Sequence, residues 1–240
     1  MYGLGESMMD DRFYATYAAA AVKGALLRTG REDLLPSALR TLSPEEMSRE
    51  ECDAMLAIGR ANGIKIYDFK KTHRDLPRVA RVLGFLKGIV FSSLLDVGSG
   101  RGVFLFPLLE EFPDALVTAT DILDARLLML SDVRCGGIDR LSVARADVTT
   151  QPFPEKSFDV VTMLEVLEHM ERPEDAIRAA VAMARRYVIV TVPSHPDDNP
   201  EHIHLLDKDR LRAAFAAVGV SRLSFGGVPG HLTLFATIGE

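Results

Sequence analysis

Five short apolar runs, separated by segments with helical spacing, occupy the chain after residue 91 and restrict its fold more than any other feature. The runs are SLLDV (93–97), ALVTATD (115–121), RLSVA (140–144), FDVVTML (158–164) and YVIVTV (187–192). Each run is too apolar to leave one strand face in water, as expected for strands that are buried on both sides. Strands that alternate with helices predict a parallel sheet covered on both faces.

Two further apolar runs follow the last predicted helix and complete the sheet. Asp207 is placed to cap that helix, which extends to Gly219. The runs RLSF (222–225) and LTLFATI (232–238) are separated by GGVPG, which favours an antiparallel pair at the sheet edge. The predicted fold class is therefore α/β, with a seven-stranded, mostly parallel sheet, helices on both faces and an antiparallel C-terminal strand.

The N-terminal part of the chain has helical character. An alanine-rich run covers residues 12–27, and Ser43 stands three residues before Glu46 with the spacing of a capping box. This box predicts a second helix that ends near Gly63. The segment IKIYDFKKTHRD that follows shows no clean period and is predicted to be a connecting loop, after which Asp75 is placed to cap a further helix.

Composition indicates a soluble globular protein. No stretch of about 18 or more apolar residues lacks charges, so no membrane partner is expected. The start MYGLGESMMDD lacks the basic and apolar regions of a secretory signal, which favours a cytoplasmic location. Cys52 and Cys135 have no neighbours at metal-ligand spacing and are predicted to be ordinary thiols. We expect an N-terminal helical extension or cap over 1–75 and one main domain over 76–240; the sequence does not indicate the oligomeric state.

The net charge of −6 argues against broad coating of a nucleic acid, although one local segment is basic. Between residues 60 and 87, eight Lys or Arg stand against two acids. Such a run is usually the solvated side of a loop and helix, but it leaves RNA open as a partner. The eight residues are Arg60, Lys65, Lys70, Lys71, Arg74, Arg78, Arg81 and Lys87.

A glycine-rich turn directly follows the first core strand, in the sequence LLDVGSGRG (94–102). Glycines there let the backbone turn sharply and let a ligand approach main-chain N–H groups. Dinucleotide-binding loops space their glycines as G-x-G-x-x-G, whereas this loop reads G-x-G-x-G. Asp96 lies two residues before the first glycine, where a carboxylate attracts a cation and repels a pyrophosphate. The loop therefore favours a sulfonium nucleoside, and Asp121, at the end of the next predicted strand, is placed to bind the ribose that both ligand classes contain.

The motifs DVGSGRG, Asp121 and ADVTTQPFPEKSFDVVTMLEVLEHM together resemble those of class I S-adenosylmethionine-dependent methyltransferases, in particular the type 11-like members, over roughly residues 76–240. The resemblance implies a Rossmann-like fold and S-adenosylmethionine as the cofactor. It implies that the glycine loop surrounds the methionine part, that an acid binds the ribose, and that further residues contact the adenine and the sulfonium. The cofactor-binding residues assigned in this way are Asp96, Gly98, Gly100, Gly102, Asp121, Ile122, Asp147, Val148 and Met163.

The segment Glu165–His169 is predicted to begin a helix at the carboxyl end of a central strand, which is where open α/β sheets bind ligands. Three interpretations remain open. The EH pair lines the pocket and orients loops without a metal; or Glu165 or His169 removes a proton from the nucleophile, which makes both candidate catalytic residues. In the third, Glu165, Glu168, His169 and His202 resemble the metal-binding set of small-RNA ribose 2′-O-methyltransferases, a family from which this sequence departs around PSHPDDN.

The predicted function is methyl transfer from S-adenosylmethionine to an acceptor by in-line displacement, with a small molecule as the expected partner. Aromatic residues near Tyr67 and Phe69 are expected to help shape the acceptor site. The alternatives are a metal-assisted RNA ribose methyltransferase, an NAD-dependent oxidoreductase, and a nucleoside-binding protein without catalysis. The sequence leaves the acceptor and the methylated atom undefined.

Overall fold

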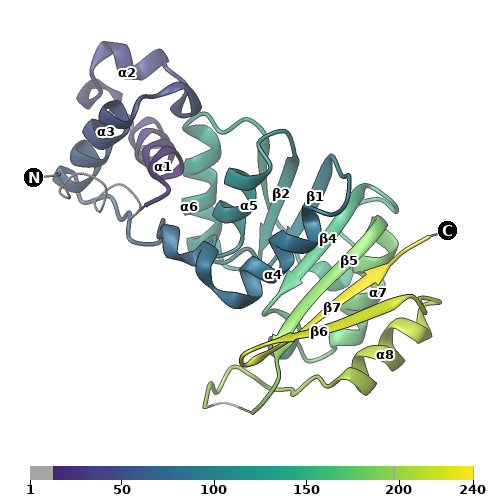
Figure 1. The fold of residues 1–240 in the computed structure, drawn as a ribbon. Coiled ribbons are helices and arrows are strands. Elements are labelled where there is room, and N and C mark those ends of the chain that lie inside the picture. The colour runs from purple at the N-terminus through teal and green to yellow at the C-terminus, as the bar shows by residue number, and fades with distance from the viewer. Residues whose placement is uncertain (1–12, 197, 240) are drawn as a thin grey trace, which may run out of the picture.

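A computed structural model describes residues 13–196 and 198–239 (Figure 1). The helices are α1 (Ala15–Arg28), α2 (Ser37–Thr41), α3 (Arg49–Ala61), α4 (Pro77–Leu86), α5 (Leu105–Glu111), α6 (Asp124–Cys135), α7 (Pro173–Met183) and α8 (Lys208–Ala217). Five 3-10 turns are η1 (Glu32–Leu34), η2 (Pro44–Glu46), η3 (Lys71–Asp75), η4 (Val148–Thr150) and η5 (Leu167–His169). The strands are β1 (Ser93–Val97), β2 (Leu116–Asp121), β3 (Leu141–Arg145), β4 (Phe158–Leu164), β5 (Ala184–Pro193), β6 (Leu223–Val228) and β7 (His231–Thr237).

The seven strands form one sheet in the order β3-β2-β1-β4-β5-β7-β6. The first five strands are parallel to one another, and β7 inserts antiparallel between β5 and β6. The order reverses direction beside β1, so the carboxyl ends of β1 and β4 flank the position where open α/β sheets bind ligands. The predicted fold class, with its mostly parallel sheet and antiparallel C-terminal strand, is confirmed.

Helices cover both faces of the sheet, as the apolar runs predict. Leu94 and Val160 point into a core with α4, α5 and α6, while their neighbours Leu95 and Val161 point into a second core with α7 and α8. Because successive strand residues face opposite sides, a strand buried on both faces needs this continuous apolar character.

The N-terminal helices pack against one end of the α/β core, beside α6 (Figure 1). Helix α1 approaches α6 so closely that a Cβ on Gly24 would lie 1.9 Å from the carbonyl oxygen of Asp132. Arg28 also forms a bidentate ion pair with the Asp132 carboxylate, with Nε–Oδ1 and Nη2–Oδ2 distances of 2.7 and 2.9 Å. The Phe69 ring lies 4.6 Å from that of Phe106 in α5, so the hydrophobic core continues across residue 75. The division into 1–75 and 76–240 stays a prediction.

Two predicted helix starts are wrong. Ser43 caps only the short turn η2, and the capping box is formed by Ser48 and Glu51 at the start of α3. Asp75 lies in η3 within the segment predicted to be a loop, and α4 begins instead with Pro77 and no side-chain cap. Pro77 suits the first helical turn because it has no N–H to satisfy. The predicted cap by Asp207 is confirmed, since its carboxylate accepts a hydrogen bond from Arg210 N.

Both cysteines are free thiols, Cys52 buried and Cys135 exposed. Over residues 13–196 and 198–239, no helix combines the length and the apolar character that crossing a bilayer requires.

Candidate functional site

Two adjoining cavities open at the carboxyl edge of the sheet. The larger, of about 810 Å³, extends from the glycine loop past the ends of β2 and β3. The smaller, of about 150 Å³, lies between the glycine loop, the end of β4 and the start of α4. Gly98, Gly100 and Glu165 line both and therefore mark the junction between them. The larger volume is in the range of small-molecule sites.

The three glycines of the loop adopt left-handed conformations, with φ of +67° at Gly98, +56° at Gly100 and +76° at Gly102. A Cβ on Gly98 would lie 2.7 Å from Val166, and one on Gly102 would lie 2.2 Å from the ring of Phe106. A Cβ on Gly100 would have only the carbonyl oxygen of Gly98 nearby, at 3.8 Å. Gly98 and Gly102 are thus required by packing against the protein itself, whereas Gly100 leaves space at the junction for a ligand.

Asp121 connects the glycine loop to the end of β2. Its Oδ2 accepts a hydrogen bond from Gly100 N at 3.0 Å, and its Oδ1 accepts one from Leu123 N at 2.9 Å. The residue is only 8% exposed, yet it lines the larger cavity. Each carboxylate oxygen has a second lone pair, so Asp121 can hold the loop and accept from two ligand hydroxyls at once.

Asp96 lies at the base of the smaller cavity, and its side chain is almost fully buried. Its Oδ1 accepts a hydrogen bond from Thr162 Oγ1 at 2.7 Å. Burial raises the pKa of the Asp96 carboxyl to about 6, because the desolvation of the charged form outweighs the hydrogen bonds from Thr162 and Ser99. A cationic group in this cavity would restore the charged form.

The remaining predicted cofactor residues occupy different positions. Ile122 is 60% exposed and, with Val148, lines the larger cavity. Asp147 also lines it, but its Oδ1 accepts from both the N–H and the hydroxyl of Thr149, which fixes the turn η4. Met163 is fully buried in the core with α7 and α8 and lies outside the lining of both cavities.

The prediction that the segment Glu165–His169 begins a helix is wrong. Glu165 has a φ of +58°, which is unusual for a residue with a side chain, and only the short turn η5 follows it. The side chain of Glu165 contacts β5 and β7. Glu168 and His169 instead lie beside the loop after β5, where Ile203 N donates a hydrogen bond to the carbonyl oxygen of Glu168. One sequence motif therefore supplies two separate polar groups.

The first group joins Glu165 to two other strands. Thr191 in β5 donates a hydrogen bond to Glu165 Oε1 at 2.7 Å, and His231 Nε2 lies 3.1 Å from Oε2. Sequence reasoning missed His231. The signal was present in the predicted antiparallel last strand, because such a strand starts at the edge where its parallel neighbour ends, and His231 indeed pairs with Pro193.

The second group contains three of the four residues in the metal hypothesis. The ligand atoms of Glu168, His169 and His202 all lie within 4.8 Å of one another. The rings of His169 and His202 are 4.7 Å apart, and His169 Nδ1 lies 3.0 Å from the carbonyl oxygen of Glu201. Glu165 is outside this cluster, so the predicted four-residue set is not assembled. His169 is exposed and lines the larger cavity.

Neither aromatic residue expected at the acceptor site lines the two cavities at the glycine loop. Phe69 is fully buried in the core, so that expectation is wrong for it. Tyr67 lines a separate groove between α1 and α6. Arg126 is the one residue that lines both this groove and the larger cavity.

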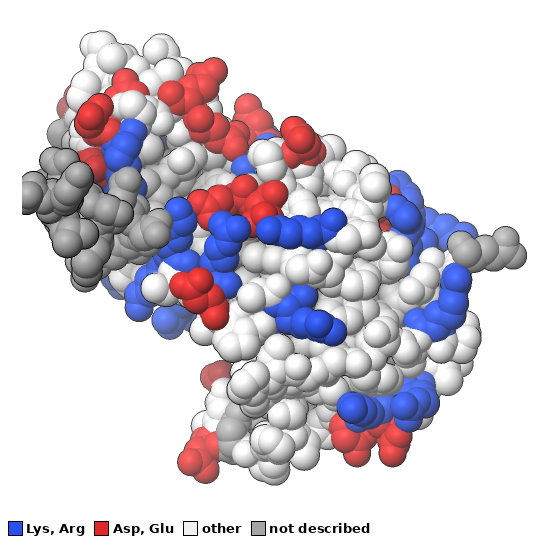
Figure 2. All heavy atoms as spheres, viewed as in Figure 1, with Lys and Arg blue, Asp and Glu red and all other residues white. Residues whose placement is uncertain are grey.

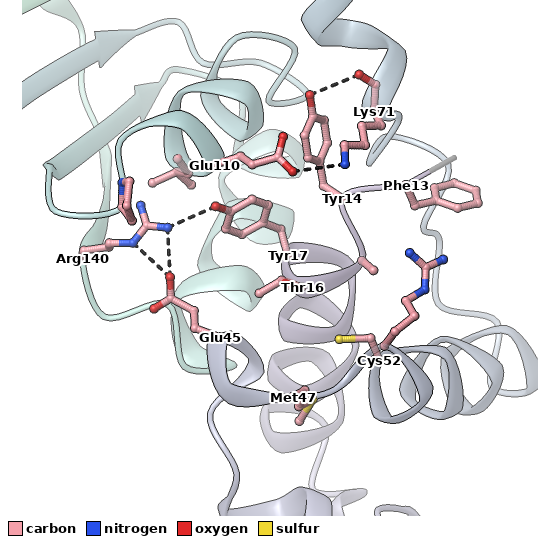
Figure 3. Close-up of a pocket in the computed structure, with 14 residues that line it drawn as sticks. Phe13, Tyr14, Thr16, Tyr17, Glu45, Met47, Cys52, Lys71, Glu110 and Arg140 are labelled. Carbon is pink, nitrogen blue, oxygen red and sulfur yellow. Dashed lines mark hydrogen bonds and ion pairs between the residues drawn. The ribbon is translucent and has the colours of Figure 1, made fainter. Parts of the chain in front are cut away.

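A further cavity of about 410 Å³ lies between the N-terminal helices and α5 (Figure 3). Arg140 donates to Tyr17 and Glu45 there, and Lys71 pairs with Glu110 at 3.4 Å. Burial raises the pKa of Tyr17 to about 12, so its phenol stays neutral. Arg140 directly precedes β3, which places this cavity at the amino edge of the sheet. Its paired groups join the helices to the core, away from the glycine loop.

The basic segment between residues 60 and 87 is partly neutralised. Lys71, Arg74 and Lys87 form ion pairs with Glu110 and Glu111 of α5. Figure 2 shows acidic side chains interspersed with basic ones on this face of the molecule. These ion pairs reduce the positive charge that the segment could present to RNA.

Comparison with known proteins finds similarity to methyltransferases. Residues 95–189 match the methyltransferase domain family. The ubiquinone biosynthesis O-methyltransferase of Pseudomonas fluorescens is 31% identical over 120 residues, which are 49% of this chain and 50% of that protein. The chain thus spans about half the length of the curated relatives it matches.

Solved structures match over a longer stretch. A SAM-dependent methyltransferase from Aquifex aeolicus superposes with a TM-score of 0.56 and 18% identity, covering 70% of this chain and 93% of the other. The magnesium protoporphyrin IX methyltransferase of Synechocystis superposes with a TM-score of 0.53 and 16% identity, covering 91% of this chain and 98% of the other. At such identities the likeness concerns the fold, and it includes most of the N-terminal part.

Proposed function

We propose that this chain, whose residues 95–189 belong to the methyltransferase domain family, transfers a methyl group from S-adenosylmethionine to a small-molecule acceptor. The observation that carries the proposal is the pair of cavities that share the glycine loop. Asp121 lies on the side of the larger one and Asp96 at the base of the smaller one. The O-methyltransferase relatives act in ubiquinone biosynthesis by name, which supports an acceptor of small-molecule size.

The residues present fit the donor. In this proposal the nucleoside lies in the larger cavity, with its ribose on Asp121 and its adenine between Ile122 and the turn that Asp147 begins. The amino acid lies in the smaller cavity, with its ammonium toward Asp96 and its carboxylate toward Arg78. The sulfur then lies at the junction beside Gly100 and Glu165.

The donor supplies a methyl group on a sulfonium, which is already a good leaving group. The protein therefore contributes mainly by holding donor and nucleophile in line. Glu165 at the junction and His169 at the cavity rim are the proposed acceptors of a proton from an oxygen or nitrogen nucleophile. The helical part over 1–75 is proposed to support this site, and the protein is proposed to act in the cytoplasm.

Calorimetry with S-adenosylhomocysteine and NAD in parallel tests the proposal directly. Micromolar binding of S-adenosylhomocysteine alone is the expected result. Binding of NAD alone would contradict the proposal and support the oxidoreductase alternative.

Donor affinity is expected to fall below pH 6. The pKa of Asp96 is about 6, so at lower pH this carboxyl is neutral in the free protein and no longer attracts the ammonium. The affinity for S-adenosylhomocysteine should therefore drop by up to about tenfold per pH unit below 6. Titrations at several pH values check this, with 5′-methylthioadenosine as the control because it lacks the amino acid. A parallel fall for both ligands would contradict the role of Asp96.

Removal of divalent cations tests the metal alternative. The proposed donor contacts use carboxylates, an arginine and the glycine loop, so excess EDTA should leave the affinity for S-adenosylhomocysteine unchanged. The same measurement on His202→Ala should also give an unchanged affinity, since His202 lies outside the lining of the larger cavity. A cation that copurifies with the protein, and whose removal abolishes methyl transfer, would instead support a metal held by Glu168, His169 and His202.

A further inference from the structure

The pair formed by Glu165 and His231 lies beside the junction of the two cavities, and nothing in the proposed mechanism yet uses His231. The two side chains are 22% and 25% exposed, and His231 Nε2 is 3.1 Å from Glu165 Oε2. On its other side, His231 Nδ1 is 3.1 Å from the carbonyl oxygen of Pro229. Thr191 holds the second oxygen of the Glu165 carboxylate.

These contacts place the imidazole of His231 where it can offset the charge of the Glu165 carboxylate. A carbonyl oxygen only accepts, so the contact with Pro229 requires a hydrogen on Nδ1 of His231. The imidazole Nε2 lies at ion-pair distance from the carboxylate oxygen, so a proton on Nε2 places a positive charge directly beside Glu165.

We propose that His231 is a positioning residue that neutralises Glu165 and prevents its carboxylate from binding the sulfonium of the donor too tightly; this inference rests on the proposed function. Glu165 lines both cavities, so an unbalanced carboxylate there would face the sulfur. The left-handed backbone at Glu165 fixes the side chain in this place.

The benefit follows from the charge change during the reaction. As the carbon–sulfur bond breaks, its electron pair passes to sulfur and the positive charge of the sulfonium disappears. A carboxylate beside the sulfur would stabilise the bound donor more than the transition state, and so would slow the transfer. An imidazolium beside the carboxylate reduces this cost, and the carboxylate of Glu165 stays available to accept a proton from the acceptor.

The affinities for S-adenosylmethionine and S-adenosylhomocysteine test the inference without any acceptor, because the two differ by the methyl group and its charge. In His231→Ala and in His231→Gln, the affinity for S-adenosylmethionine relative to S-adenosylhomocysteine should rise about tenfold, the size expected for a partly screened charge pair. The Gln variant keeps a donor toward Glu165 but removes the second ionisable group, so it separates charge from shape.

Two controls make the test specific. The ratio should stay at the wild-type value in His204→Ala, whose imidazole contacts the carbonyl oxygen of Glu171 instead. In Glu165→Gln, the additional change His231→Ala should no longer alter the ratio. An unchanged ratio in both His231 variants, or an equal rise in the Glu165→Gln background, overturns the inference. If the wild-type protein binds neither ligand, the proposed function itself fails.

Discussion

Replacing Asp121 with alanine is expected to lower the affinity for S-adenosylhomocysteine by at least about 100-fold. A hydrogen bond to a charged group contributes about 1.5–3 kcal/mol, and two ribose hydroxyls would lose their acceptor together. The change also removes the acceptor for Gly100 N and Leu123 N, so the glycine loop keeps its backbone hydrogen bond to β2 from Ser99 N to Thr120 O but loses the side-chain one. Calorimetry on the purified variant measures the loss.

Two control variants test whether the loss of affinity is specific to Asp121. Asp139→Ala removes an exposed carboxylate that pairs only with Arg134 among its described contacts, and it should leave the affinity unchanged. Asp121→Asn keeps one acceptor oxygen and should give an intermediate affinity. An affinity for the alanine variant within about threefold of wild type would show that the nucleoside does not bind at the end of β2.

Replacing Gly24 with alanine is expected to destabilise the protein by about 3 kcal/mol, although alanine is the better helix former. The new Cβ would lie 1.9 Å from a backbone oxygen of α6, which cannot move away as a flexible side chain would. Helices α1 and α6 would have to separate. Thermal unfolding should show a Tm lower by roughly 6–12 °C, given the usual 2–4 °C per kcal/mol for chains of this length.

Gly84 provides the matched control, because it also lies inside a helix but has open space where a Cβ would be. Gly84→Ala should therefore raise the stability by about 0.5–1 kcal/mol through helix propensity alone. Equal effects at both positions would contradict the close packing of α1 on α6.

The sheet could be predicted because its signal is local. Strands β1 and β4 begin and end where their apolar runs do, since residues buried on both faces have to be apolar. The helix starts were harder to predict from the sequence. Ser43 and Ser48 both precede a glutamate at capping-box spacing, so spacing alone does not distinguish the box that forms, at Ser48, from the one that does not.

The candidate site could likewise be predicted only in part from the sequence. The glycine loop and Asp121 follow from strand ends, and these can be read from the sequence. Glu165 could not be placed correctly, because the helical pattern of its motif gives no sign of the left-handed backbone that turns its side chain toward β5. His231 is distant in sequence, and only the register of β7 against β5 brings it to Glu165.

The place of His231 in the last strand has a consequence for biosynthesis. Synthesis proceeds from the N-terminus, so the glycine loop, Asp121 and Glu165 all leave the ribosome long before residues 231–237 do. Until β7 pairs with β5, Glu165 at the proposed donor-binding edge lacks its imidazole neighbour. The contact between Glu165 and His231 therefore depends on the pairing of β7 with β5, which joins residues far apart in the sequence.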